Sequence, residues 1–132
     1  MKLYLDSSAI VKLVKLEPES SALRRFLKRH RADGRVTSSL ARVEVVRAVA
    51  PGGAEAVAHA RRQLARIDQL NLDPTLLDAA AALPTTAVLR SLDAIHIASA
   101  LAIGADLRAI VTYDERMTSA AAAEGMVTEA PA

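Results

Sequence analysis

Four acidic residues stand at positions where a carboxylate could take part in chemistry. Asp6 and Asp114 each end a short apolar run, LYLD and AIVTYD, while Asp93 lies near the start of SLDAIHIASA. Glu44 lies inside the valine-rich segment VEVVRAV. Carboxylate oxygens are ligands for Mg²⁺ and Mn²⁺, and a pair of such ions can activate a water molecule and stabilise the leaving oxygen of a phosphodiester. These four residues are therefore the candidates for a hydrolytic metal site.

Each acid also has a simpler structural explanation. The three aspartates could cap or neutralise the first turn of a helix, because helix N-termini favour acceptors and negative charge. Ser91 could be the capping residue of the helix that contains Asp93. Glu44, flanked by valines, would need a cation or a proton if buried, and Arg47 is the candidate partner for a plain salt bridge. No single residue distinguishes these alternatives.

Short apolar runs alternate with segments of helical periodicity along the chain. Strands are expected at 3–6, 35–38, 70–73, 109–114 and 126–129. Helices are expected at 8–16, 18–31, 39–50, 55–67, 75–83, 91–104 and 115–125. Strands separated by helices in this way are typical of parallel pairing through helical crossovers. The predicted fold class is α/β, a three-layer sandwich with a short central parallel sheet flanked by helices.

In such a sheet the acids would meet at one edge. The carboxyl ends of parallel strands lie on the same side, and open α/β sheets bind their ligands just beyond those ends. Asp6 and Asp114 end strands, and the helix containing Asp93 would begin at the same edge. Carboxylates gathered there repel one another, so the arrangement is stable mainly when a divalent cation neutralises it. The joint pattern favours a metal site over separate helix caps.

Length and composition limit the remaining possibilities. With 132 residues the chain has the commonest size of one domain, so a single domain over 1–132 is expected. Cysteine is absent and there are three histidines, which excludes disulfides and thiolate sites and leaves oxygen ligands for a metal. No membrane span or signal peptide is expected, which predicts a cytoplasmic protein. The net charge of +2 is compatible with a phosphate-bearing partner.

The motifs together resemble the PIN-domain family and, within it, the VapC-type ribonuclease toxins of bacterial toxin–antitoxin pairs. The resemblance is carried by LYLDSSAIVKLVKLEPES, the isolated Glu in a valine-rich helix, SLDAIHIASAL and IVTYDERM, in the family's order over residues 2–127. It implies a PIN-like fold and an endoribonuclease that depends on Mg²⁺ or Mn²⁺. The residues that it assigns to catalysis and metal binding are Asp6, Glu44, Asp93 and Asp114. It implies that Ser7 and Thr112 support the site.

The same resemblance implies partners. They are an RNA substrate, a small VapB-type antitoxin protein and a second copy of the chain in a homodimer. An acidic edge is also a suitable seat for an arginine of such an antitoxin, since a guanidinium pairs bidentately with carboxylates. His96, three residues after Asp93, could touch the site, although a packed or hydrogen-bonded histidine is the simpler interpretation.

Two other functions were weighed against this one. A receiver domain of two-component signalling also gathers acids at strand ends, but it would need a lysine near a late strand, and the last lysine here is Lys28. A catalytically weak PIN-like scaffold that binds RNA or protein is the second alternative. A missing acid would support the scaffold, and all four acids are present. Base recognition stays unassigned, because aromatic side chains for stacking make up only 2% of the chain.

Overall fold

A parallel sheet lies at the centre of the computed structural model, which describes residues 1–84 and 89–132. Within these ranges its strands are β1 (Lys2–Leu5), β2 (Gly34–Ser38), β3 (Asp68–Leu70), β4 (Leu107–Val111) and β5 (Thr128–Glu129). They follow one another across the sheet in the order β3-β2-β1-β4-β5, and every neighbouring pair is parallel. The first strand of the chain is therefore the central one.

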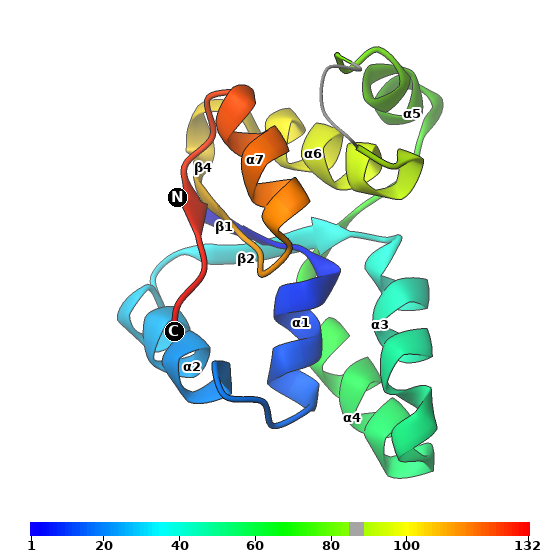
Figure 1. Ribbon diagram of the computed structural model, residues 1–132, viewed down its shortest axis with the longest axis vertical. Helices are drawn as coiled ribbons and strands as arrows, with labels where there is room; N and C mark the ends of the chain where they lie inside the picture. Colours follow the sequence, from blue (N-terminus) through cyan, green and yellow to red (C-terminus); the bar gives the residue numbers. More distant parts are fainter. Residues whose placement is uncertain (85–88) are drawn as a thin grey trace.

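Helices cover both faces of this sheet (Figure 1). The described helices are α1 (Ser7–Val14), α2 (Ser20–Arg29), α3 (Ala41–Val49), α4 (Ala54–Leu64), α5 (Pro74–Ala81), α6 (Ser91–Ile103) and α7 (Glu115–Ala123). In Figure 1, α1 to α4 lie on one side of the sheet and α5 to α7 on the other. The predicted three-layer α/β sandwich is confirmed. Within the described ranges, none of the helices has the length and apolar character that a membrane span requires.

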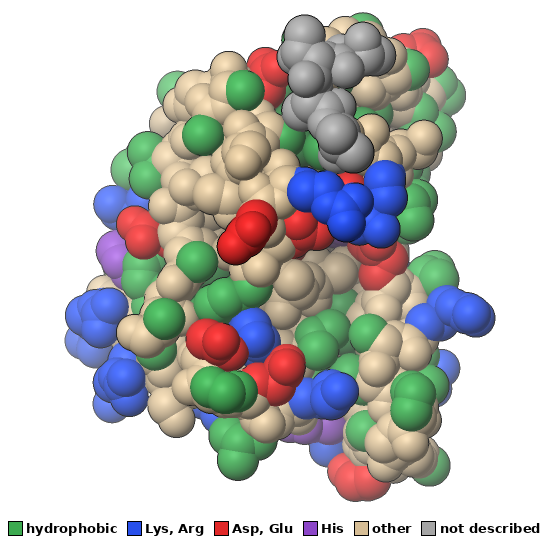
Figure 2. Space-filling model, viewed as in Figure 1, with side chains coloured by type: hydrophobic (Ala, Val, Ile, Leu, Met, Phe, Trp, Pro, Cys, Tyr) green, Lys and Arg blue, Asp and Glu red, His purple; other side chains and the backbone are tan. Residues whose placement is uncertain are grey.

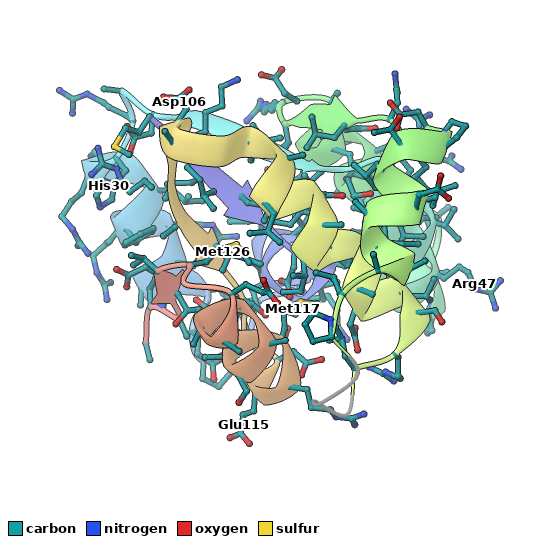
Figure 3. The ribbon with its side chains drawn as sticks, turned by 90° about the horizontal axis from the view of Figure 1, so that it is seen from above. His30, Arg47, Asp106, Glu115, Met117 and Met126 are labelled. Carbon is teal, nitrogen blue, oxygen red and sulfur yellow. The ribbon has the colours of Figure 1, made fainter. Side chains whose placement is uncertain are left out.

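Strand β1 connects the two layers of the core, because its side chains alternate between the faces of the sheet. Leu3 and Leu5 belong to a core cluster with residues of α1 to α4. Tyr4, between them, belongs to a second cluster with residues of α6 and α7 and with Ile110 of β4. Met117 of α7, which is labelled in Figure 3, is a member of this second cluster. Strands β1 and β4 are buried on both faces of the sheet, which is why their sequences are nearly continuous apolar runs.

The order of elements agrees with the sequence-based prediction, but several boundaries differ by one to three residues, among them the ends of α4 and β4. The strand expected at 70–73 is wrong by about two residues, since β3 is Asp68–Leu70. Asp73 instead caps α5, accepting a hydrogen bond from the backbone N of Leu76 at 2.8 Å. The helix expected from residue 18 begins at Ser20, because the Ser20 hydroxyl holds the preceding turn by accepting a hydrogen bond from the backbone N of Glu17.

The direction of the chain across the sheet reverses at β1. After β1 the chain adds β2 and β3 on one side and then returns to place β4 and β5 on the other. Such a reversal leaves a crevice at the carboxyl ends of the two strands that flank it, and ligands of open α/β sheets bind there. The segments that leave β1 and β4 at this point begin with Asp6 and Thr112.

Leu5 provides a test of the larger core. Its side chain has no exposed surface, so we expect Leu5→Ala to lower the free energy of unfolding by about 2–5 kcal/mol through the cavity it leaves. Urea denaturation measures this change. Leu16→Ala is the matched control, since Leu16 is 83% exposed and its truncation should change stability by no more than about 0.5 kcal/mol. Equal losses in both variants would contradict the described core.

Candidate active site

Asp6 is a buried carboxylate at the junction of β1 and α1. One of its oxygens accepts hydrogen bonds from the backbone N of Ala9 at 3.0 Å and from the Ser8 hydroxyl at 2.6 Å. The other accepts a hydrogen bond from the Thr112 hydroxyl. Only 3% of Asp6 is exposed, and this burial raises its pKa against the opposing effect of the three donors. Asp6 is thus a helix cap, but capping by itself does not require a buried charge.

Thr112 joins the ends of the two central strands. It follows β4, it is fully buried, and it donates its hydroxyl proton to the Asp6 carboxylate. The same hydroxyl accepts a hydrogen bond from the backbone N of Asp114 at 3.1 Å. Asp114 in turn caps α7, with one carboxylate oxygen 2.9 Å from the backbone N of Arg116. The structure therefore brings Asp6 and Asp114 to the same edge of the sheet, as the sequence predicted.

Glu44 reaches this edge from α3. Its Oε1 atom accepts a hydrogen bond from the Ser7 hydroxyl at 2.8 Å and lies 2.6 Å from Nε2 of His96. Partial burial acts to raise the pKa of Glu44, but the hydrogen bonds from His96 and Ser7 outweigh it and lower that pKa. The alternative of a plain salt bridge to Arg47 is not what the structure shows: Arg47 is exposed and points away from the molecule (Figure 3), because it lies on the outer side of α3.

Asp93 lies in the first turn of α6, where Arg90 is its partner. The alternative in which Ser91 caps this helix does not hold, since Ser91 is the first helical residue and no described side chain caps this N-terminus. Instead, Nε of Arg90 donates a hydrogen bond to Asp93 Oδ2 at 3.2 Å. Nη2 of the same guanidinium lies 3.9 Å from Asp114 Oδ2. One arginine therefore bridges two acids, and Figure 2 shows acidic and basic side chains together near the middle of this face.

The site is built from three small groups of side chains. They are Asp6–Thr112, Ser7–Glu44–His96–Tyr4 and Arg90–Asp93–Asp114. The groups are close enough to act on one another, because the Thr112 hydroxyl joins Asp6 to the backbone of Asp114 and the charge of Arg90 lowers the pKa of Glu44, as a smaller influence than burial and hydrogen bonding. The four predicted acids thus share one electrostatic environment.

The donor set suits a hard divalent cation, although the side chains are not closed around one. Within residues 1–84 and 89–132, no three Asp, Glu or His side chains are arranged to hold a metal ion as they stand. Every acid at the edge offers only oxygen, as Mg²⁺ and Mn²⁺ require. The Arg90 guanidinium already lies between Asp93 and Asp114, where it supplies the positive charge that this pair needs. The residues present therefore fit a cation that would replace Arg90 there.

Two members of the site were not found from the sequence. Arg90 precedes Asp93 by three residues, and this spacing within a helix turn was the available signal for the pair. Tyr4 offered only a weak signal, a hydroxyl within a buried apolar strand. His96 is hydrogen-bonded, as the simpler interpretation held, and it also touches the candidate Glu44.

The buried charge of Asp6 predicts a gain in stability when it is removed. Because burial raises the folded-state pKa of Asp6, the ionised side chain costs about 1.4 kcal/mol for each unit of that increase. We therefore expect Asp6→Asn, which still caps α1, to raise the free energy of unfolding of the metal-free protein at pH 7. This gain in stability should shrink as the pH falls through the folded-state pKa of Asp6. It should vanish below the unfolded-state pKa, where Asp6 is protonated in both the folded and the unfolded protein.

Urea denaturation at pH 7 and pH 4 measures this gain. Asp73→Asn is the matched control, because Asp73 caps α5 in the same way but is exposed. Its substitution should change stability little at either pH. A loss of stability in Asp6→Asn at pH 7 would refute the buried-charge interpretation and leave Asp6 as a cap alone.

Comparisons with known proteins agree with this fold. The sequence model of the PIN domain matches residues 3–123. Ribonuclease VapC46 of Mycobacterium tuberculosis (strain ATCC 25618 / H37Rv) is 52% identical over 130 residues, which cover 98% of this chain and 97% of that protein. Ribonuclease VapC35 of Mycobacterium tuberculosis (strain CDC 1551 / Oshkosh) is 44% identical over 134 residues, covering 98% of this chain and 96% of that protein.

Two solved structures share the arrangement of strands and helices. The crystal structure of Mycobacterium tuberculosis VapC20, described as a sarcin-ricin loop cleaving toxin, superposes with a TM-score of 0.76 at 18% identity, covering 98% of this chain and 99% of that one. VapBC2 from Rickettsia felis, bound to a DNA fragment from its promoter, gives a TM-score of 0.72 at 14% identity, covering 98% of each chain. At these identities the likeness concerns the fold. The chain belongs to the PIN domain family, and its curated relatives within that family are ribonucleases of the VapC group.

Proposed function

We propose that this chain is an endoribonuclease that acts as the toxin of a VapBC-type toxin–antitoxin pair. The observation that carries the proposal is the meeting of four acids at the carboxyl ends of β1 and β4, where the sheet reverses its strand order. Relatives named as ribonucleases, 52% and 44% identical over nearly the whole chain, support the same activity. The substrate under this proposal is the phosphodiester backbone of RNA.

The proposed site depends on a divalent metal ion. Nucleases of this family generally need such an ion, and we propose Mg²⁺ or Mn²⁺ because the donors are carboxylates. The residues that would hold it are Asp6, Glu44, Asp93 and Asp114. When bound, the ion would supply Lewis-acid stabilisation of phosphate oxygens and an activated water molecule for in-line attack.

The chain's own contribution is to fix the carboxylates. Thr112 and Ser8 hold the two oxygens of Asp6 from opposite sides, and Ser7 donates to Glu44. Arg90 neutralises two acids in the absence of a metal ion and must give up this contact when the cation arrives. The supporting roles proposed for Ser7 and Thr112 are thus hydrogen bonds that orient carboxylates.

Inhibition by an antitoxin follows from the same charges. The bridge from Arg90 to Asp93 and Asp114 is an example of how a guanidinium fits this edge. We propose that a small VapB-type protein inserts an arginine of its own and so obstructs the metal site. The homodimer, the single-domain organisation and the cytoplasmic location stay predictions, which size-exclusion chromatography, limited proteolysis and cell fractionation can test.

Metal-dependent cleavage of RNA is the first test. The purified chain should cleave single-stranded or loop RNA with Mg²⁺ or Mn²⁺ and stop in excess EDTA. Loss of a residue that only supports a metal ligand typically lowers activity by about 10–100-fold. Asp6→Asn, Glu44→Gln and Asp93→Asn should each lower the cleavage rate by more than that, because each removes a proposed ligand. Asp78→Asn, an exposed acid of α5, is the control that should retain the wild-type rate. Undiminished cleavage in EDTA would contradict the metal mechanism, and wild-type rates in all three variants would contradict the catalytic role of these acids. Absence of cleavage by the wild-type protein with either ion would favour the scaffold alternative.

Growth arrest in bacteria tests the toxin assignment separately. Regulated expression of the chain alone should stop growth, and co-expression of a small adjacent gene for its antitoxin should restore it. Asp6→Asn should be harmless while still binding the antitoxin, because it removes one charge and keeps the fold. If wild-type expression leaves growth and RNA profiles unchanged in a host depleted of the antitoxin, the toxin assignment is wrong even if the nuclease activity is real.

A further inference from the structure

A buried hydrogen-bonded chain leads from the centre of the sheet to the acidic edge. The Tyr4 hydroxyl lies 2.7 Å from Nδ1 of His96, and Nε2 of His96 lies 2.6 Å from Oε1 of Glu44. Tyr4 is fully buried and His96 is 2% exposed. Their rings meet edge to face, with centroids 5.9 Å apart. Both nitrogens of one buried imidazole are thus occupied, and one of its two partners is a candidate metal ligand.

Chemistry sets the direction of these hydrogen bonds. An ionised carboxylate only accepts, so Nε2 of His96, which lies 2.6 Å from Oε1 of Glu44, must donate to it. Burial raises the pKa of Tyr4 far above its ordinary range, so the phenol keeps its proton and can donate. Nδ1 of a neutral imidazole with its proton on Nε2 is an acceptor. One tautomer of His96 therefore satisfies Tyr4 and Glu44 together.

Neighbouring groups at the Tyr4 hydroxyl support this direction. The Ser99 hydroxyl lies near the phenol oxygen of Tyr4, but it donates its single proton to the carbonyl of Ile95 at 2.7 Å, which anchors it in α6. Among the described residues, the hydrogen bond of the Tyr4 hydroxyl is the one to Nδ1 of His96. The proton of Tyr4 is then free for His96.

As a result, the two carboxylate oxygens of Glu44 differ in their hydrogen bonding. Oε1 receives both Ser7 and His96. Within the part of the chain that the structure describes, Oε2 accepts no hydrogen bond from the protein. Two donors on one oxygen restrict rotation of the carboxylate about its terminal bond, and they leave the second oxygen available at the edge where Asp6 lies.

We propose that Tyr4 and His96 are positioning residues for Glu44: the Tyr4 hydroxyl fixes the Nε2–H tautomer of His96, which holds Glu44 with one oxygen available to a divalent cation. This inference rests on the proposed function, since it assigns Glu44 to the metal. Partners that orient a ligand in this way set metal affinity, and their loss typically weakens it by about 10–100-fold. A purely structural histidine would instead affect stability and leave metal affinity unchanged.

The tautomer is tested first, by nitrogen-15 NMR of the metal-free wild-type protein. His96 should carry its proton on Nε2, with Nδ1 in the shift range of a hydrogen-bond acceptor. The opposite tautomer would overturn the proposal, because Nε2 could not then donate to Glu44.

Metal affinity of matched variants provides the second test, with Mn²⁺ binding measured by isothermal titration calorimetry on variants whose circular dichroism matches the wild type. Tyr4→Phe removes one hydroxyl and should weaken Mn²⁺ binding about tenfold, and His96→Leu should weaken it by about 10–100-fold. His96→Gln keeps an amide donor near the position of Nε2 and should stay within about threefold of the wild type. Tyr113→Phe, which removes a hydroxyl bonded to the carbonyl of Pro131, should change nothing.

The outcomes separate this inference from the proposed function. Wild-type Mn²⁺ affinity in both Tyr4→Phe and His96→Leu would overturn the positioning role. Equal losses in His96→Gln and His96→Leu would overturn it too, because the donor to Glu44 would then have no special part. If Glu44→Gln itself binds Mn²⁺ and cleaves RNA like the wild type, the proposed metal site fails instead. In RNA cleavage, the positioning variants should lower kcat and leave KM nearly unchanged.

Discussion

The hydrogen bond between Thr112 and the buried carboxylate of Asp6 ties the two central strands together at their carboxyl ends. It spans 106 residues of sequence and forms only if β4 lies beside β1. That pairing also creates the reversal of strand order at which α/β sheets bind ligands. The helices that begin with Ser7 and Glu115 follow these strands within a few residues, so the positions of both N-termini depend on the same contact. Fold and candidate site therefore share one constraint.

A helix cap and a metal ligand are compatible roles at this edge. Asp6 and Asp114 cap their helices with one oxygen each. A carboxylate has two oxygens, so the second remains for other partners, which are Thr112 and Arg90 here. Asp6 has an energetic cost, because its burial disfavours the ionised carboxylate and raises its pKa. A site that holds acids close together in this way is less stable alone than with a cation, and Arg90 supplies part of that charge within the chain.

The sequence by itself determined the order of strands and helices, the parallel α/β class and the place of the four acids at one edge. It could do so because these features depend on residues that are close together in the sequence: the spacing of apolar residues, the signals that start and stop helices, and the residue that ends a strand. The supporting roles of Ser7 and Thr112 were instead implied by the resemblance to the PIN-domain family, and both residues lie within two residues of a strand end. The start of β3 was misplaced because Leu72, an apolar residue just before the Asp73 cap, resembles a strand residue.

Only the tertiary structure decided which side chains touch. Tyr4 and His96 are 92 residues apart, and His96 and Glu44 are 52 apart. Their contacts depend on how α3 and α6 pack against the sheet, and no local pattern encodes that packing. The same reason explains why Arg90 partners Asp93 and why His96, rather than Arg47, partners Glu44. A side chain reaches its partner only after the backbone elements have fixed its direction, so the sequence could name the acids but not the groups that hold them.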